Sequence, residues 1–102
     1  SITHRVTGVL MFFSSFLMLW ALDQSLASEA SFNAVAEVLS SPLAKVISWG
    51  IASVLTYHAL AGIKHLIMDA GIGETMRGGV LGARIVFLLA AAAAALWGVL
   101  IW

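Results

Sequence analysis

Three long apolar stretches without any charged residue constrain the fold of this chain more than any other feature. They run Val6–Leu22, Val46–Ile63 and Ile85–Trp102. A helix that crosses the hydrocarbon core of a bilayer needs about 20 mainly apolar residues, and each stretch reaches that length once its flanks are included. The sequence therefore predicts a single domain, residues 1–102, with transmembrane helices at about 3–26, 42–69 and 81–102.

The composition excludes an ordinary soluble domain. Hydrophobic residues make up 62% of the chain and charged residues only 10%, against about 25% charged in a typical globular domain. Cysteine is absent, so the chain itself supplies neither a disulfide nor a cysteine-ligated zinc or iron–sulfur site. The formal net charge is zero, which argues against nucleic acid as a partner. We expect an all-α integral membrane protein in contact with lipid.

Basic residues predict how the chain is oriented in the membrane. The segment 23–42 carries acidic residues but no lysine or arginine. Cytoplasmic loops of membrane proteins carry an excess of these basic residues, so we expect the N-terminus and the loop 69–84 on the cytoplasmic or matrix side. Four basic residues flank that side: Arg5, Lys64, Arg77 and Arg84.

The segments between the spans carry helix signals of their own. Ser41-Pro42 is typical of a helix start, with serine as the N-cap and proline at the first helical position. Glycines between residues 71 and 82 predict a break before the third span. Within the segment 27–40, helical spacing predicts a short amphipathic helix on the membrane surface through Phe32, Val35, Ala36 and Leu39.

Two histidines in the second span, His58 and His65, are costly in lipid and therefore mark a functional site by default. They lie two helical turns apart on one face, with the small residues Ala61 and Gly62 between them. Such a face would let a large planar ligand, such as a haem, approach the backbone. Two turns correspond to about 11 Å, so both histidines cannot ligate one iron. If a haem is bound, we expect His58 as its ligand, a second ligand from another chain, and His65 beside a propionate or Asp69.

A simpler interpretation of these polar residues stays open. Both histidines can be interior residues of a helix bundle, satisfied by hydrogen bonds between helices. At the start of the first helix, Ser1 and Arg5 can hydrogen-bond a carbonyl oxygen of a lipid-soluble ligand, and Arg5 can also bind a haem propionate. The alternative is that Arg5 only anchors the helix at the interface. Tyr57 is either a hydrogen-bond donor within the bundle or a packing residue.

Two sequence motifs lie at these positions. Residues 1–8 are SITHRVTG, and residues 58–69 are HALAGIKHLIMD. They resemble the patterns S-I-x-H-R-x-[ST]-G and H-x-x-x-G-[IV]-[RK]-H-x-x-x-D of a known family, the cytochrome b556 subunits of succinate dehydrogenase, with Lys64 where arginine is commoner. The two motifs occur in the right order, and the resemblance spans essentially the whole chain.

The resemblance implies a multi-pass anchor subunit of respiratory complex II in the bacterial or mitochondrial inner membrane. Such an anchor forms a bundle with a second small anchor subunit. A flavoprotein and an iron–sulfur subunit then pass electrons from succinate, an intermediate of the tricarboxylic acid cycle, to ubiquinone. The isolated chain is not expected to be catalytic.

The resemblance also implies roles for individual residues. His58 would be an axial ligand of haem b, and the second anchor subunit would supply the other ligand. Cofactor-binding residues near the haem would be His4, Arg5 and His65, while Ser1 and Arg5 would bind ubiquinone. Two alternatives remain open: the anchor of a fumarate reductase, which runs the reaction in reverse, and a haem-free membrane scaffold.

Overall fold

A computed structural model of the chain describes residues 2–102, and these residues are almost entirely helical. Four helices follow one another: α1 (Ile2–Ala27), α2 (Glu29–Leu39), α3 (Pro42–Asp69) and α4 (Met76–Ile101). Of these, α1, α3 and α4 are long and apolar enough to cross a membrane. The prediction of an all-α protein with three transmembrane helices is confirmed.

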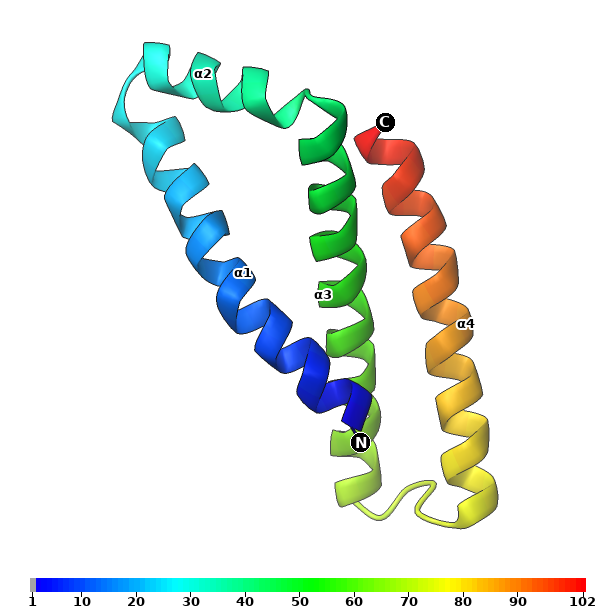
Figure 1. The fold of residues 1–102 in the computed structure, drawn as a ribbon. Coiled ribbons are helices and arrows are strands. Elements are labelled where there is room, and N and C mark those ends of the chain that lie inside the picture. The colour runs from blue at the N-terminus through cyan, green and yellow to red at the C-terminus, as the bar shows by residue number, and fades with distance from the viewer. Residues whose placement is uncertain (1) are drawn as a thin grey trace.

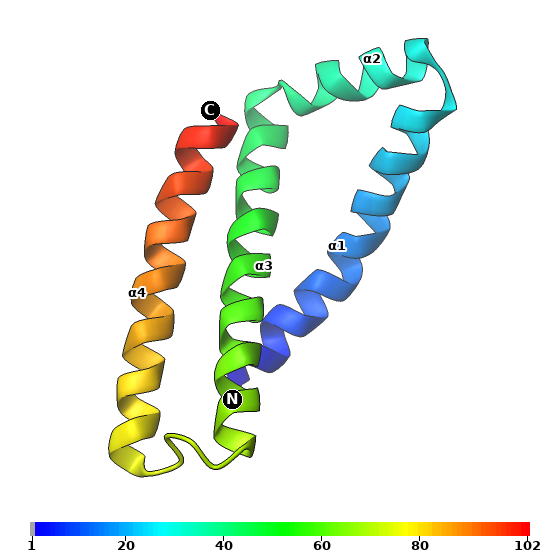
Figure 2. The ribbon, with the colours of Figure 1, turned by 180° about the vertical axis from the view of Figure 1, so that it is seen from behind.

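The helix α3 lies between the other two long helices (Figure 1). The helix α4 runs antiparallel to α3 along most of its length. In contrast, α1 crosses α3 near the N-terminus and diverges from it toward α2, as both views show (Figures 1 and 2). The molecule is elongated, with extents of 54 × 23 × 18 Å. The N-terminal end of α1 and the α3–α4 turn therefore lie at one end, and α2 and the C-terminus lie at the other.

Capping side chains set where the helices begin. Ser41 is the N-cap of α3, and its hydroxyl accepts a hydrogen bond from the backbone N–H of Ala44, with Pro42 as the first helical residue, as predicted. Thr75 caps α4 in the same way through Gly78. The helix α4 therefore begins at Met76 and not near residue 81. The later glycines do not break it, because glycine is well tolerated in transmembrane helices.

The predicted break is confined to the turn that joins α3 to α4. Gly71 and Gly73 have φ angles of 89° and 70°, the left-handed region that other residues rarely adopt. The N–H of Ile72 donates to the carbonyl of Ile67 at 3.2 Å, and the N–H of Gly71 donates to that of Met68 at 2.9 Å. These bonds form a Schellman motif, which ends α3 by satisfying its last carbonyl groups.

Two tryptophans connect α3 to α4. The indole N–H of Trp49 donates to the carbonyl of Ala94 at 2.8 Å. The indole N–H of Trp97 donates to the Thr56 hydroxyl at 2.9 Å. Gly98 lets the Trp49 ring approach the α4 backbone, since an added Cβ there would lie 3.4 Å from the indole nitrogen. These contacts hold α3 and α4 together as an antiparallel pair.

The described part of the chain has almost no interior of its own. Among residues 2–102, only Ala61 and Val86 are buried, with 4% and 8% of their surface exposed. Large apolar side chains along α1, such as Phe12 and Phe16, are each 60% exposed. Lipid tails are as apolar as these side chains, so their exposure carries no penalty within a membrane. The surface is suited to contact with lipid or with other transmembrane helices.

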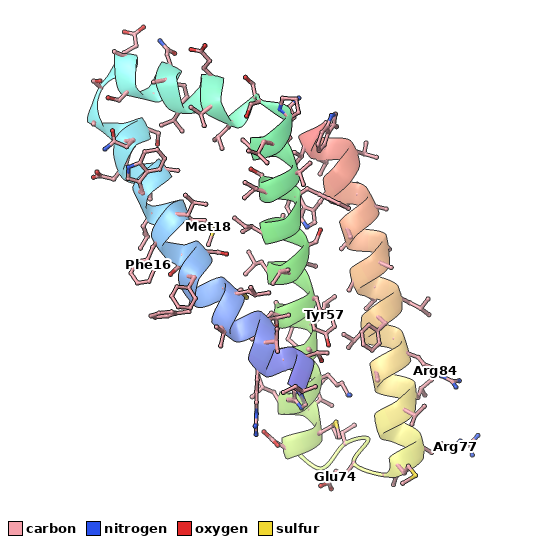
Figure 3. The ribbon with its side chains drawn as sticks, in the orientation of Figure 1. Phe16, Met18, Tyr57, Glu74, Arg77 and Arg84 are labelled. Atoms are coloured by element: carbon pink, nitrogen blue, oxygen red, sulfur yellow. The ribbon has the colours of Figure 1, made fainter. Side chains whose placement is uncertain are left out.

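We predict that the α3–α4 turn faces the cytoplasm or matrix and that α2 faces the opposite side. The turn lies at the same end as the N-terminal end of α1, and Arg77 and Arg84 project outward from α4 near it (Figure 3). Cysteines introduced by Glu74→Cys and Asn33→Cys would be unique in the chain and exposed. In intact cells or mitoplasts, an impermeant thiol reagent should label position 33 and not position 74. The reverse labelling would contradict the charge argument.

Candidate functional site

Three histidine rings meet where α1 crosses α3. The ring of His4, from α1, stacks on the ring of His58, from α3, with centroids 4.0 Å apart and planes inclined by 8°. The ring of His65 meets His4 edge-on, with centroids 5.3 Å apart. All three side chains are half-buried. The structure thus brings together the two histidines of the second span and the histidine that the family resemblance placed near the cofactor.

Two glycines allow this close approach of the helices. A Cβ atom added to Gly8 on α1 would lie 3.3 Å from Cε1 of His58, and one added to Gly62 on α3 would lie 3.5 Å from Cε1 of His4. Each histidine therefore lies against the backbone of the opposite helix. We expected the face at Gly62 to be open to a planar ligand. It is instead covered by His4, because the absence of a side chain lets α1 occupy that space.

A threonine on α1 holds the ring of His58. Oγ1 of Thr7 lies 2.8 Å from Nδ1 of His58 and also donates to the backbone carbonyl of His4 at 3.0 Å. Thr7 and Gly8 belong to the first motif, but sequence reasoning assigned neither of them a role in the site. A signal was present, since residues three and four positions apart share one face of a helix, and His4, Thr7 and Gly8 have this spacing.

Tyr57 takes part in a hydrogen bond and also packs against an aromatic ring, so it is not a packing residue alone. Its hydroxyl lies 2.8 Å from Oγ1 of Thr3 on α1. Its ring stacks on Phe87 of α4 at 5.6 Å, on the side of α3 that faces α4 (Figure 3). A cavity of about 120 Å³ adjoins these groups and is also lined by Lys64 and His65. Tyr57 therefore joins all three long helices beside the histidines.

Arg5, the remaining predicted site residue that the structure describes, lies at the same end of the molecule. Arg5 is exposed in the first turn of α1, next to His4. Ser1, its expected companion in binding a quinone, lies outside the described residues. Within residues 2–102, no group of three or more His, Asp or Glu side chains is arranged to hold a metal ion directly. The histidine cluster is therefore not a three-ligand metal cage.

Comparison with known proteins agrees with the resemblance seen in the motifs. Residues 1–99 match the family described as succinate dehydrogenase/fumarate reductase transmembrane subunit. The chain is 36% identical to a succinate dehydrogenase cytochrome b556 subunit from Coxiella burnetii, over 100% of this chain and 82% of that protein. A transmembrane-subunit family and three span-length apolar helices together identify a multi-pass protein of the inner membrane.

Two further relatives match shorter parts. A succinate dehydrogenase cytochrome b556 subunit from Paracoccus denitrificans is 37% identical over 72% of this chain and 56% of its own length. A succinate dehydrogenase 2 membrane subunit from Mycobacterium tuberculosis is 30% identical over 67% of this chain and 50% of its own length.

We predict that the α1–α3 crossing does not tolerate a side chain at Gly8. Gly8→Val would force the ring of His58 away from its position, and overpacking of this kind typically costs about 1–3 kcal/mol. Gly50→Val is the matched control on α3, because nothing lies within 4 Å of a Cβ atom added there. The melting temperature in detergent should fall for Gly8→Val and stay near that of the parent protein for Gly50→Val. Equal effects would show that the crossing is not tightly packed.

Proposed function

The chain belongs to the succinate dehydrogenase/fumarate reductase transmembrane subunit family, and on this premise we propose that it is the haem b- and ubiquinone-binding membrane anchor of a succinate dehydrogenase. All three relatives described above are named as succinate dehydrogenase subunits, which favours oxidation of succinate over the reverse reaction. The observation that carries the proposal is the half-buried histidine cluster at the α1–α3 crossing.

The environment of His58 fits an axial haem ligand. Its Nδ1 is held by Thr7 at 2.8 Å, whereas its Nε2 makes no hydrogen bond within residues 2–102. The ring of His4 covers one face of His58 and leaves the in-plane lone pair of a ring nitrogen available for coordination. Haem b, when bound, would supply a one-electron carrier between the iron–sulfur subunit and the quinone. His4 and Arg5 would contribute donors for its propionates, and His65, at the edge of the cluster, would be a third.

The geometry of the cluster supports a second anchor subunit. His58 and His65 are two helical turns apart on α3, about 11 Å along the axis, so His65 cannot be the other ligand of the same iron. The other ligand would come from the second anchor. The exposed apolar side chains of α1 and α4 also provide surface for further transmembrane helices. The iron–sulfur and flavoprotein subunits would dock at the end that carries the basic residues.

Ubiquinone would bind at the N-terminal end of α1. Arg5 is exposed there, and Ser1 precedes it by four positions in the sequence. Hydrogen bonds from Ser1 and Arg5 would orient a quinone carbonyl. Arg5 and the helix N-terminus would both favour negative charge that develops on the ring during reduction. The adjacent histidine cluster would keep this site close to the haem.

We predict that His58→Ala removes the haem from an assembled complex. His58 would be the only axial ligand that this chain supplies. His65→Ala is the matched control on the same helix, and it should perturb the haem without removing it. A reduced-minus-oxidised absorption spectrum of each purified complex measures the difference. An unchanged b-type spectrum in the His58→Ala complex would disprove the assignment, and a parent complex without haem would favour a haem-free scaffold.

We also predict that Arg5→Leu and Ser1→Ala lower quinone reduction about tenfold or more. Loss of a charge-assisted hydrogen bond costs about 1.5–3 kcal/mol, and each 1.36 kcal/mol corresponds to tenfold in rate. Succinate oxidation by a soluble dye that accepts electrons before the quinone should stay near the parent rate.

Arg77→Leu provides the matched control for this experiment. Arg77 lies at the same end but projects outward from α4 (Figure 3). If Arg5 only anchors its helix at the membrane interface, the two arginine variants should behave alike in both assays. Full quinone reduction by an assembled Arg5→Leu complex would place the quinone site elsewhere.

A further inference from the structure

We propose that Thr7 is a positioning residue that fixes the tautomer and orientation of His58, so that Nε2 is the nitrogen presented to the haem iron. The inference rests on the proposed function, because it concerns how the ligand is prepared. It adds a residue of α1 to a site whose ligand lies on α3. Thr7 itself touches neither the iron nor the quinone in this proposal.

The hydrogen bonds of Thr7 determine which atom carries each proton. A threonine hydroxyl has one proton to donate, and a backbone carbonyl can only accept. Oγ1 of Thr7 donates to the carbonyl of His4 at 3.0 Å. Both contacts are satisfied at once only when the same oxygen accepts from Nδ1 of His58, 2.8 Å away. Nδ1 of His58 then carries the proton, and Nε2 carries the lone pair that a metal requires.

A second threonine in the same molecule has the same arrangement with an unambiguous direction. Oγ1 of Thr56 donates to the carbonyl of Ala52 at 2.8 Å on its own helix. It also accepts from the indole N–H of Trp97 on α4 at 2.9 Å, and an indole N–H can only donate. Thr7 repeats this pattern across the α1–α3 contact, with an imidazole in place of the indole.

This arrangement has two consequences for a bound haem. A ligating histidine that donates its other N–H to a hydrogen-bond acceptor has a fixed ring orientation and a more basic ligating nitrogen. A more basic ligand favours ferric over ferrous iron, so the Thr7 hydroxyl should lower the reduction potential of the haem. The stacked ring of His4 and the close backbone at Gly8 restrict the tilt of the His58 ring further.

The test compares three variants of the intact complex. Thr7→Val removes the hydroxyl and keeps the shape of the side chain, whereas Thr7→Ser keeps the hydroxyl. Thr56→Val removes the equivalent hydroxyl between α3 and α4, where its partner is Trp97 and not a histidine. The measurements are haem content, the midpoint potential of the haem, and the position of its low-spin ferric electron paramagnetic resonance signal, which depends on the orientation of the axial imidazole planes.

We expect Thr7→Val to weaken haem retention about tenfold, within the range for loss of such a partner. If the preference of the site for ferric over ferrous haem falls tenfold, the midpoint potential rises by about 59 mV, the value for one electron. The ferric resonance signal should move, Thr7→Ser should restore the parent values, and Thr56→Val should leave them unchanged. Haem loss in Thr7→Val that is absent from the other two variants would support the same conclusion.

A Thr7→Val complex that keeps its haem with the parent potential and resonance signal would overturn this inference and leave the proposed function intact. Equal haem loss in Thr7→Val and Thr56→Val would also overturn it, because the effect would then reflect weakened helix packing. A parent complex that contains no haem would overturn the proposed function and this inference together.

Discussion

The close approach of α1 and α3 is the contact on which the rest of the site depends. Gly8 and Gly62 each leave room for a histidine from the opposite helix, so the two backbones and the two imidazole rings form one layered contact. Beyond the crossing the two helices diverge, and a groove of about 210 Å³ opens between them. The polar groups of the α1–α3 contact therefore gather at one end of the molecule.

The two helix contacts of α3 differ in kind. On the α4 side, two indole N–H groups form hydrogen bonds between α3 and α4. A hydrogen-bonded turn joins the other ends of the two helices, so this pair is held along its length. Toward α1, the contact depends on imidazole and hydroxyl groups near one end. The exposed surface of all three long helices is apolar, which suits lipid and neighbouring helices equally. The α3–α4 pair thus supports His58 on α3, while α1 completes the surroundings of this side chain.

The sequence was sufficient to predict which residues share a face of one helix. It indicated three spans, the start of α3 at Ser41-Pro42 and the two histidines on one face of α3. It could not indicate which helix would cover that face, so His4 over Gly62 was not foreseen. Thr7 was missed for the same reason, since its partner His58 is 51 positions away. The start of α4 at Met76 was misjudged because glycines break helices in water more readily than in lipid.

The groups that meet at the crossing are far apart in the sequence, and this separation affects how the helices assemble in the membrane. The helix α1 leaves the ribosome before α3, and the partners of its polar side chains follow 51 to 54 residues later. The first span therefore enters the bilayer before Thr3, His4 and Thr7 can contact their partners on α3. Helices that insert independently and associate afterwards are the usual route for membrane proteins. Docking of α1 against α3 then follows their insertion, and the stacked rings of His4 and His58 can form only in that step.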